Sequence, residues 1–307
     1  MIPIPDDAAA ASNLPLWQEA LFGIEILLLH AAPVYYGFGV PPGDGSGVVI
    51  IPGFLANDVY LVELYAWLKR LGYRPYFSGI GLNADCPNLL MRSRLHSTIE
   101  QAWRETGKRV HLLGHSLGGL LARAAAGERW RQVRSVITLG SPFRGTVLHP
   151  RVGQAVERVR QHILANRGDS VLPGCYTGRC TCAFLNSLRH DLPRPISETA
   201  IYSRSDGMVD WRCCVTGNEE DDFAVIGTHI GMVFNPVVYG IIAGRLAAPR
   251  SRALEAKTAG PRPPIQIAAS VSAPSGVPSS SARSGRRQSA RKARSASASG
   301  PRSSGSR

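Results

Sequence analysis

A serine flanked by glycines, in the sequence GHSLG at residues 114–118, is the feature best suited to chemistry. The apolar run 110–113 precedes it and a helical pattern over 117–128 follows it, so the serine falls on a sharp turn from a strand into a helix. Such a turn crowds the residues two before and two after the serine, which explains why both are glycine. The pattern predicts that Ser116 is a nucleophile beside the free amides of a helix N-terminus.

A serine hydroxyl needs a neighbouring base, and the base needs a group that orients it. Asp206 comes just after the apolar stretch 200–203, and His229 comes just after 223–226. The carboxyl ends of parallel strands meet at one edge of a sheet, so these side chains can converge there. Serine, then acid, then histidine is also the chain order expected for a strand–turn–helix nucleophile. We therefore expect a catalytic triad of Ser116, Asp206 and His229.

Other side chains compete for these roles. Asp210 could replace Asp206 as the acid, although local pairing or capping near Trp211 accounts for it better. His115 adjoins the nucleophile but points away from the turn, so we expect it to pack rather than react. Three further histidines fall in a less regular stretch and are expected to be solvated, namely His149, His162 and His190.

Attack by serine on a carbonyl carbon creates an oxyanion, which needs fixed N–H donors. One donor is expected to be the amide of Leu117, the residue after the nucleophile. The other is expected to be the amide of Phe54, in the loop that follows the first core strand at 47–51. An ordinary Pro-Gly turn at 52–53 is the alternative interpretation of that loop.

The elements that must position these residues alternate along the chain. A continuous apolar run predicts a strand at 47–51, and further strands are predicted at 74–77, 110–113, 133–139, 200–203 and 223–226. Helical spacing predicts helices at 14–32, 58–71, 92–106, 117–128 and 232–246. This alternation indicates an α/β fold with a mostly parallel six-stranded sheet and helices on both faces.

Together these motifs resemble the bacterial lipase/esterase family of the α/β-hydrolase superfamily, over about residues 47–246. The resemblance rests on the following sequences, PGF at 52–54, GHSLGG at 114–119, TLGSP at 138–142, Tyr202-Ser203 with Asp206, and GTH at 227–229. It implies the α/β-hydrolase fold and ester hydrolysis through an acyl-enzyme, without a metal or organic cofactor. The chain departs from the family at Pro52, where His is common, and at Phe143, where many relatives carry His.

We divide the chain into an N-terminal lead-in with a helix at 1–46, an α/β-hydrolase domain at 47–248 and a tail at 249–307. The stretch 146–199 lies where relatives carry a cap or lid. Its valines alternate with arginines in a pattern typical of a lid helix that meets lipid, and equally of an ordinary cap helix.

The leading interpretation is a serine esterase or lipase acting on a small-molecule or lipid ester with an apolar acyl group. The same triad would serve an acyltransferase. A third interpretation is a non-catalytic hydrolase-fold protein that binds its partner through the basic tail.

The net charge of +13 is concentrated in the tail. Residues 251–307 contain 11 Lys and Arg, one acidic residue, 15 Ser and no aromatic residue, which predicts a disordered segment. The remaining chain is nearly neutral, so we expect no specific nucleic-acid partner. The tail could contact an anionic membrane surface weakly. We expect a monomer.

The stretch 21–34 is too short to span a bilayer, and the N-terminus lacks the basic residues of a secretory signal. These features favour the cytoplasm. The six cysteines are expected to be free thiols. The alternatives are a disulfide of Cys86 with Cys213 or Cys214, and a zinc site over 175–182, whose spacing matches no common zinc motif.

Overall fold

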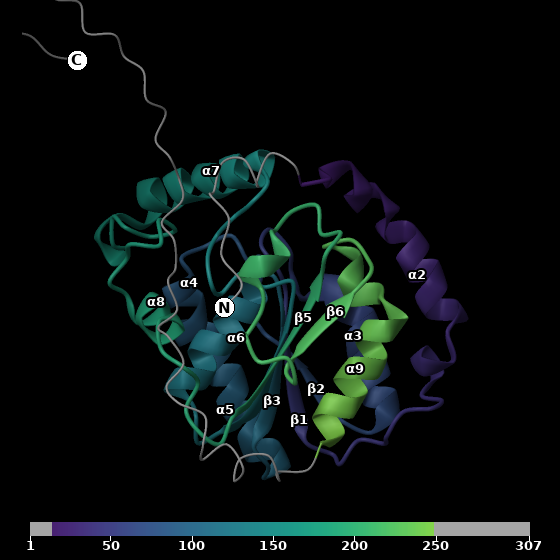
Figure 1. Ribbon diagram of the computed structural model, residues 1–307. Helices are drawn as coiled ribbons and strands as arrows, with labels where there is room; N and C mark the ends of the chain where they lie inside the picture. Colours follow the sequence, from purple (N-terminus) through teal and green to yellow (C-terminus); the bar gives the residue numbers. More distant parts are fainter. Residues whose placement is uncertain (1–13, 249–307) are drawn as a thin grey trace, which may run out of the picture. The chain divides into compact units, whose positions relative to one another are not determined.

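The protein, described as a computed structural model over residues 14–248, is built around one parallel sheet (Figure 1). The strand order is β2-β1-β3-β4-β5-β6. The strands are β1 Gly47–Ile51, β2 Arg74–Phe77, β3 Val110–His115, β4 Val133–Leu139, β5 Ser197–Ser203 and β6 Asp222–Val225. The α/β class and the six predicted strands are confirmed. The predicted disordered tail at 249–307 lies outside the described residues, as do residues 1–13.

Helices cover both faces of this sheet. The α-helices are α2 Phe22–Ala31, α3 Val62–Leu71, α4 Pro87–Leu90, α5 His96–Thr106, α6 Leu117–Glu128, α7 Pro150–Arg167, α8 Ala183–Leu188 and α9 Pro236–Ala247. The short helical turns are η1 Leu16–Leu21, η2 Pro33–Tyr36, η3 Asp58–Leu61, η4 Met91–Leu95, η5 Gly168–Ser170, η6 Trp211–Cys213 and η7 Gly231–Phe234.

The alternation of side chains along β1 shows how the two apolar layers form. Val48 and Ile50 pack into a core with α3 and α9, whereas Val49 and Ile51 pack into a second core with α5, α6 and α8. All five residues of this strand are buried. A strand covered on both faces explains why its sequence is continuously apolar rather than alternating.

Several helices differ in detail from their predicted spans. The predicted helix 14–32 is two segments, a 3₁₀ turn η1 followed by α2. The predicted helix 92–106 begins earlier, at Pro87, and contains the π-helical turn η4. The last helix is interrupted at Asn235, whose side chain accepts hydrogen bonds from Val237 N and Val238 N and so caps α9. Pro236 fits the first position of that helix because it has no N–H to satisfy.

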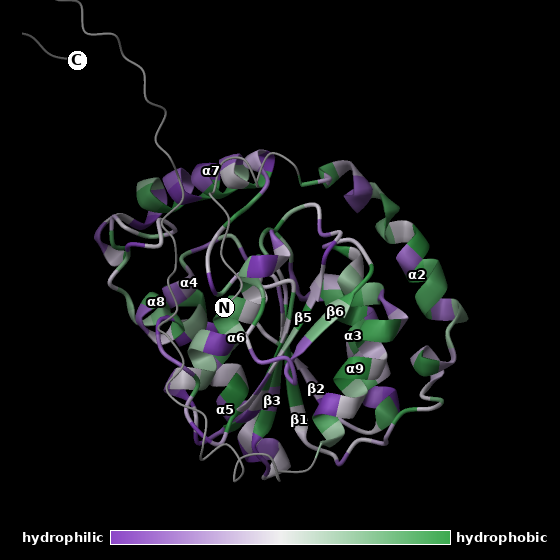
Figure 2. Ribbon diagram, in the orientation of Figure 1, coloured by the Kyte–Doolittle hydropathy of each residue, from purple (hydrophilic) through white to green (hydrophobic). Residues whose placement is uncertain are grey.

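The N-terminal segment η1–α2 is apolar, but many of its apolar side chains are exposed to solvent. Leu29 is fully buried, whereas Trp17 and Leu27 are 71% and 70% exposed. Figure 2 shows α2 as a largely hydrophobic helix at the periphery of the fold. Within residues 14–248, no helix combines the length and apolar character needed to cross a bilayer.

The stretch 146–199 contains α7, η5 and α8. Figure 1 places α7 beyond the carboxyl ends of the strands. Its apolar side chains face the protein, since Val152 and Val156 line a cavity and Ile163 packs with Cys86 and Val171. This packing suits a cap helix, and the assignment of the stretch as a cap or lid stays a prediction.

Candidate active site

Ser116 lies at the turn between β3 and α6 in a strained backbone conformation, with φ 53° and ψ −122°. A Cβ on Gly114 would lie 2.3 Å from Gly118 O, and one on Gly118 would lie 2.3 Å from Ile51 O. Both glycines are therefore required for the chain to reverse here. Ser116 N donates to Leu139 O of β4 at 2.8 Å, so the neighbouring strand holds the turn.

Asp206 and His229 form a buried pair at the ends of β5 and β6. His229 Nδ1 lies 2.6 Å from Asp206 Oδ2, and each residue is 3% exposed. The other carboxylate oxygen, Oδ1, accepts hydrogen bonds from Met208 N and Val209 N at 2.8 Å each. These two backbone bonds fix the carboxylate, so it can hold the imidazole in one orientation.

The charge around His229 favours its protonated form. Burial alone lowers the pKa of this imidazole, but the charge and hydrogen bond of Asp206 and the charge of Glu19 together raise it above its ordinary value. A base that binds a proton more tightly stabilises the imidazolium that forms during serine attack.

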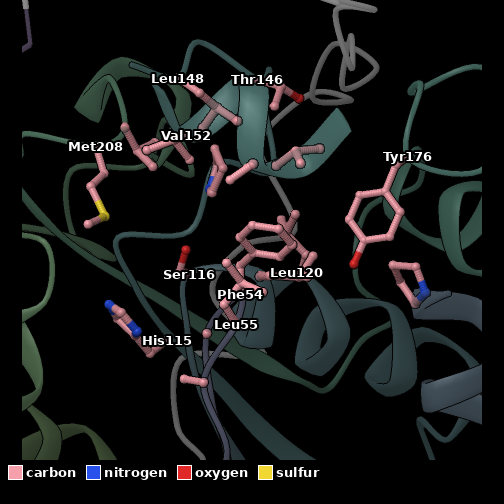
Figure 3. Close-up of a pocket in the computed structure, with 18 of the residues that line it drawn as sticks. Phe54, Leu55, His115, Ser116, Leu120, Thr146, Leu148, Val152, Tyr176 and Met208 are labelled. Carbon is pink, nitrogen blue, oxygen red and sulfur yellow. The ribbon is translucent and has the colours of Figure 1, made fainter. Parts of the chain in front are cut away.

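Ser116 and His229 line the same cavity, which has a volume of about 680 Å³. Figure 3 shows the hydroxyl of Ser116 pointing into this space. The remaining wall is mostly apolar and includes Phe54, Leu120, Leu148, Val152, Tyr176 and Met208. The structure thus brings the predicted nucleophile and the hydrogen-bonded Asp206–His229 pair to one edge of the sheet, against a space that suits an apolar group.

The two predicted oxyanion donors also adjoin this cavity. Within residues 14–248, no hydrogen bond uses the backbone amide of Phe54 or Leu117 as its donor. Both residues line the cavity, and their role as oxyanion donors stays a prediction. The loop is shaped by Leu55, which has φ 60°, a value rare outside glycine.

Asn83, which was not predicted from the sequence, holds the loop at 52–55 in place. Its side-chain amide donates to Pro52 O at 2.8 Å, and its backbone carbonyl accepts from Leu55 N at 2.9 Å. The residue is fully buried. Asn83 lies in an irregular segment that no motif marks, so only the fold brings it to this loop.

The competing aspartate and histidine have other partners. Asp210 pairs with Arg212, with Oδ2 2.6 Å from the guanidinium, and caps η6 as expected. The buried His115 places its Nε2 3.0 Å from His229 O. Burial and the neighbouring His229 lower the pKa of His115 to about 3, so it is neutral and can donate to that carbonyl. It supports the His229 segment instead of reacting.

The three histidines that were expected to be solvated do not line the cavity. His162 and His190 are exposed, as expected. His149 is only half-buried and accepts a hydrogen bond from Arg151 N at 3.2 Å, which caps the start of α7.

Two acidic residues of the N-terminal segment, Glu19 and Glu25, reach the loops of Asp206 and His229. Glu19 accepts hydrogen bonds from Gly207 N and His229 N, and Glu25 accepts one from Thr228 N. Neither residue was predicted from the sequence. The available signal was the presence of isolated acids in an otherwise apolar stretch, since buried carboxylates need partners.

The six cysteines are free thiols in this structure. Cys86 hydrogen-bonds to Cys175 rather than lying beside Cys213 or Cys214, so the structure does not form the alternative disulfide of the sequence analysis. Over residues 14–248, no group of three or more His, Cys, Asp or Glu is arranged to hold a metal ion.

Known proteins similar to this chain include one protein family and two lipases. Residues 90–170, which include the nucleophile turn, match the family described as a PGAP1-like alpha/beta domain. A triacylglycerol lipase of Burkholderia plantarii is 27% identical over 45% of this chain and 41% of its own. A triacylglycerol lipase of Pseudarthrobacter phenanthrenivorans is 29% identical over 32% of this chain and 34% of its own. The matches therefore span less than half of these relatives.

Solved structures similar to this chain include the mature Bacillus licheniformis lipase BlEst2, with a TM-score of 0.45 and 16% identity over 68% of this chain and 94% of that one. A Paleococcus ferrophilus monoacylglycerol lipase has a TM-score of 0.44 and 15% identity, over 67% and 96% respectively. The resemblance to the lipase/esterase family of the α/β-hydrolase superfamily, inferred from the motifs, is confirmed by the family match and the two sequence relatives.

Proposed function

We propose that the protein is a serine hydrolase that cleaves carboxylic esters with an apolar acyl group through an acyl-enzyme on Ser116. One observation carries the proposal. A strained serine and the imidazole of a buried His–Asp pair open onto the same mostly apolar cavity. The sequence similarity to two triacylglycerol lipases supports an ester as the substrate, although those proteins extend well beyond the matched region.

In the first half-reaction, Ser116 Oγ attacks the ester carbonyl while His229 Nε2 takes the hydroxyl proton. The hydrogen bond to Asp206 keeps the proton of the neutral imidazole on Nδ1, and the negative charge of Asp206 stabilises the imidazolium that forms. The tetrahedral oxyanion receives hydrogen bonds from the amides of Phe54 and Leu117. His229 then returns its proton to the leaving alcohol as the C–O bond breaks.

In the second half-reaction, water replaces the alcohol. His229 takes a proton from this water as the water oxygen attacks the acyl-Ser116 carbonyl. Collapse of the second tetrahedral intermediate releases the carboxylic acid and returns the proton to Ser116 Oγ. The acyl chain packs against the apolar wall of the cavity, which includes Leu120, Val152 and Met208.

Hydrolysis of p-nitrophenyl esters with acyl chains of two to sixteen carbons tests the proposal. Ser116→Ala should lower kcat by about 10⁶-fold, because the residues of a triad act as a unit. Ser93→Ala is the matched control, since this exposed hydroxyl bonds only to Leu89 O in its own helix. Equal activity in wild type and Ser116→Ala, or no hydrolysis of any ester by the wild type, would contradict the proposal.

The fate of the acyl group separates hydrolysis from acyl transfer. With a short alcohol added to the assay, a hydrolase should still release mainly free acid at low alcohol concentration. Predominant formation of the new ester would assign the same triad to an acyltransferase. The position of the rate maximum along the acyl series would then distinguish a short-chain esterase from a lipase.

A further inference from the structure

We propose that Glu19, from the N-terminal segment, is a positioning residue that holds the acid-bearing and base-bearing loops together, an inference that rests on the proposed function. Its carboxylate is only 6% exposed and accepts three backbone hydrogen bonds. Oε1 accepts from Gly207 N and His229 N, and Oε2 accepts from Ile230 N, each at 2.9 Å. One side chain thus joins the residue after Asp206 to His229 itself.

These three bonds are a strong constraint. Hydrogen bonds from N–H groups to an ionised carboxylate are roughly twice as strong as neutral ones. Among residues 14–248, Glu19 forms no salt bridge, so the backbone amides supply its polar contacts. A buried carboxylate satisfied in this way resists displacement, because any movement of either loop would leave charge or N–H groups unpaired.

Glu25, one helical segment further on, holds the same loop from the other side of His229. Its Oε1 accepts from Thr228 N at 3.1 Å and its Oε2 accepts from Thr228 Oγ1 at 2.6 Å. Thr228 Oγ1 in turn accepts from Gly231 N at 2.9 Å. The residues that flank His229 are therefore bonded to two carboxylates that precede the sheet by many residues.

The glycines of these loops supply an independent observation. A Cβ on Gly207 would lie 2.6 Å from Pro15 O, and one on Gly227 would lie 2.5 Å from Glu25 Oε1. A Cβ on Gly231 would lie 1.4 Å from Glu25 Oε2. The three glycines leave room for the N-terminal segment and its carboxylates, so the loops are shaped around them.

Glu19 also acts on the charge state of the base. The groups that face His229 are Asp206, Glu19 and the neutral ring of His115, whose centroid lies 4.8 Å away. Nearby, Glu25 bonds to Thr228, and the Tyr60 hydroxyl donates to Ile230 O at 2.8 Å. The charge of Glu19 is one of the causes that raise the pKa of His229.

The test compares Glu19→Gln and Glu19→Asp with Glu219→Gln, an exposed control. A glutamine can keep its oxygen on Gly207 N and His229 N, but its NH₂ group then faces Ile230 N, so the third bond and the charge are lost. We expect kcat to fall about 10²-fold with KM little changed, because a misplaced base costs rate rather than binding. The acid limb of kcat/KM should also move to lower pH. Glu19→Asp keeps the charge, so the acid limb of its kcat/KM profile should stay near that of the wild type. Its kcat should still fall, because the shorter side chain cannot reach all three N–H groups.

An NMR titration of the His229 imidazole gives a readout that needs no catalysis. Its pKa should be lower in Glu19→Gln than in the wild type, and unchanged in Glu219→Gln. If the wild type hydrolysed no ester, the proposed function would fail while this titration still tested the role of Glu19. A folded Glu19→Gln with unchanged kcat and an unchanged imidazole pKa would overturn the inference. If Glu19→Gln does not fold, an unaltered kcat in Glu19→Asp overturns it.

Discussion

The nucleophile turn and the loops of Asp206 and His229 lie at the same sheet edge but are built differently. The turn is made from its own residues and from β1 and β4. Gly118 packs against Ile51 O, and Ser116 N bonds to Leu139 O. The loops of the acid and the base instead surround Glu19 and Glu25, side chains from a segment that precedes the whole sheet.

The nucleophile turn is therefore held by local contacts, whereas the loops of Asp206 and His229 are held by contacts between distant parts of the chain. A turn defined by glycine spacing needs little beyond its strand and helix, because steric exclusion between near neighbours sets its shape. The base-bearing loop depends on hydrogen bonds across about two hundred residues of chain, as between Glu19 and His229. It follows that changes at the N-terminus should affect the base while leaving the nucleophile turn intact.

Within the two loops that carry the acid and the base, the largest effect is expected from Asp206→Asn, because Asp206 orients His229 directly. The amide cannot hold the imidazole in the tautomer that accepts the serine proton, so kcat should fall by about 10⁴-fold. The same assay on p-nitrophenyl esters measures it. A fall of less than tenfold would show that another group orients His229.

Gly118→Ala tests the nucleophile turn. Its new Cβ would meet the backbone oxygens of Ile51 and Pro52, which cannot move without shifting β1 and the oxyanion loop. Overpacking of this kind costs about 1–3 kcal/mol of stability, and the displaced oxyanion loop should lower kcat about 10²-fold. Urea unfolding and ester hydrolysis measure the two effects. Wild-type values in both would contradict a turn limited by steric exclusion.

Gly231→Ala provides the corresponding test of the base loop. Here the new Cβ meets the flexible end of Glu25, which can swing away at the cost of its bonds to Thr228. The effect should be smaller than for Gly118→Ala, and it should shrink in a Glu25→Ala background, where Thr228 Oγ1 at 2.6 Å is still close to the new Cβ. A double-mutant cycle on the free energy of unfolding should give a coupling of about 0.5–3 kcal/mol. Additive effects would mean that Glu25 does not occupy this space.

The pH profile sharpens the same comparison. His229 acts as a base only when neutral, and its pKa is raised, so kcat/KM should fall as pH decreases through a value above 6.5. The neighbouring His115, with a pKa of about 3, should not contribute to this limb. Rates measured from pH 5 to 9 in one buffer series test this. An acid limb below pH 6 would contradict the influence assigned to the surrounding carboxylates.

The smallest effect is expected from Asp210→Asn. This aspartate bonds to Arg212 and caps a short turn, and it has no contact with His229. Loss of a helix cap costs about 1 kcal/mol, so stability should fall slightly while kcat changes by less than threefold. A large loss of kcat would mean that Asp210, and not Asp206, acts as the acid.

The sequence by itself determined the strand–helix alternation and the nucleophile turn. Largely apolar runs marked β1, β3 and β4 because strands covered on both faces bury most of their side chains. The spacing of Gly114, Ser116 and Gly118 marked the turn because its shape depends on near neighbours alone. The order of Asp206 and His229 after their strands was also visible, since strand ends define the sheet edge.

Only the tertiary structure decided what holds those two residues. Glu19 and Glu25 stand in a segment that the sequence analysis treated as a lead-in, and nothing in their spacing refers to residues 206–231. Asn83 likewise gained its role by lying beside Pro52 O after the chain had folded. Such contacts join segments far apart in sequence, and their partners are backbone amides and carbonyls. Nearly every residue carries these groups, so an isolated acid can indicate that it needs a partner but not which segment supplies that partner.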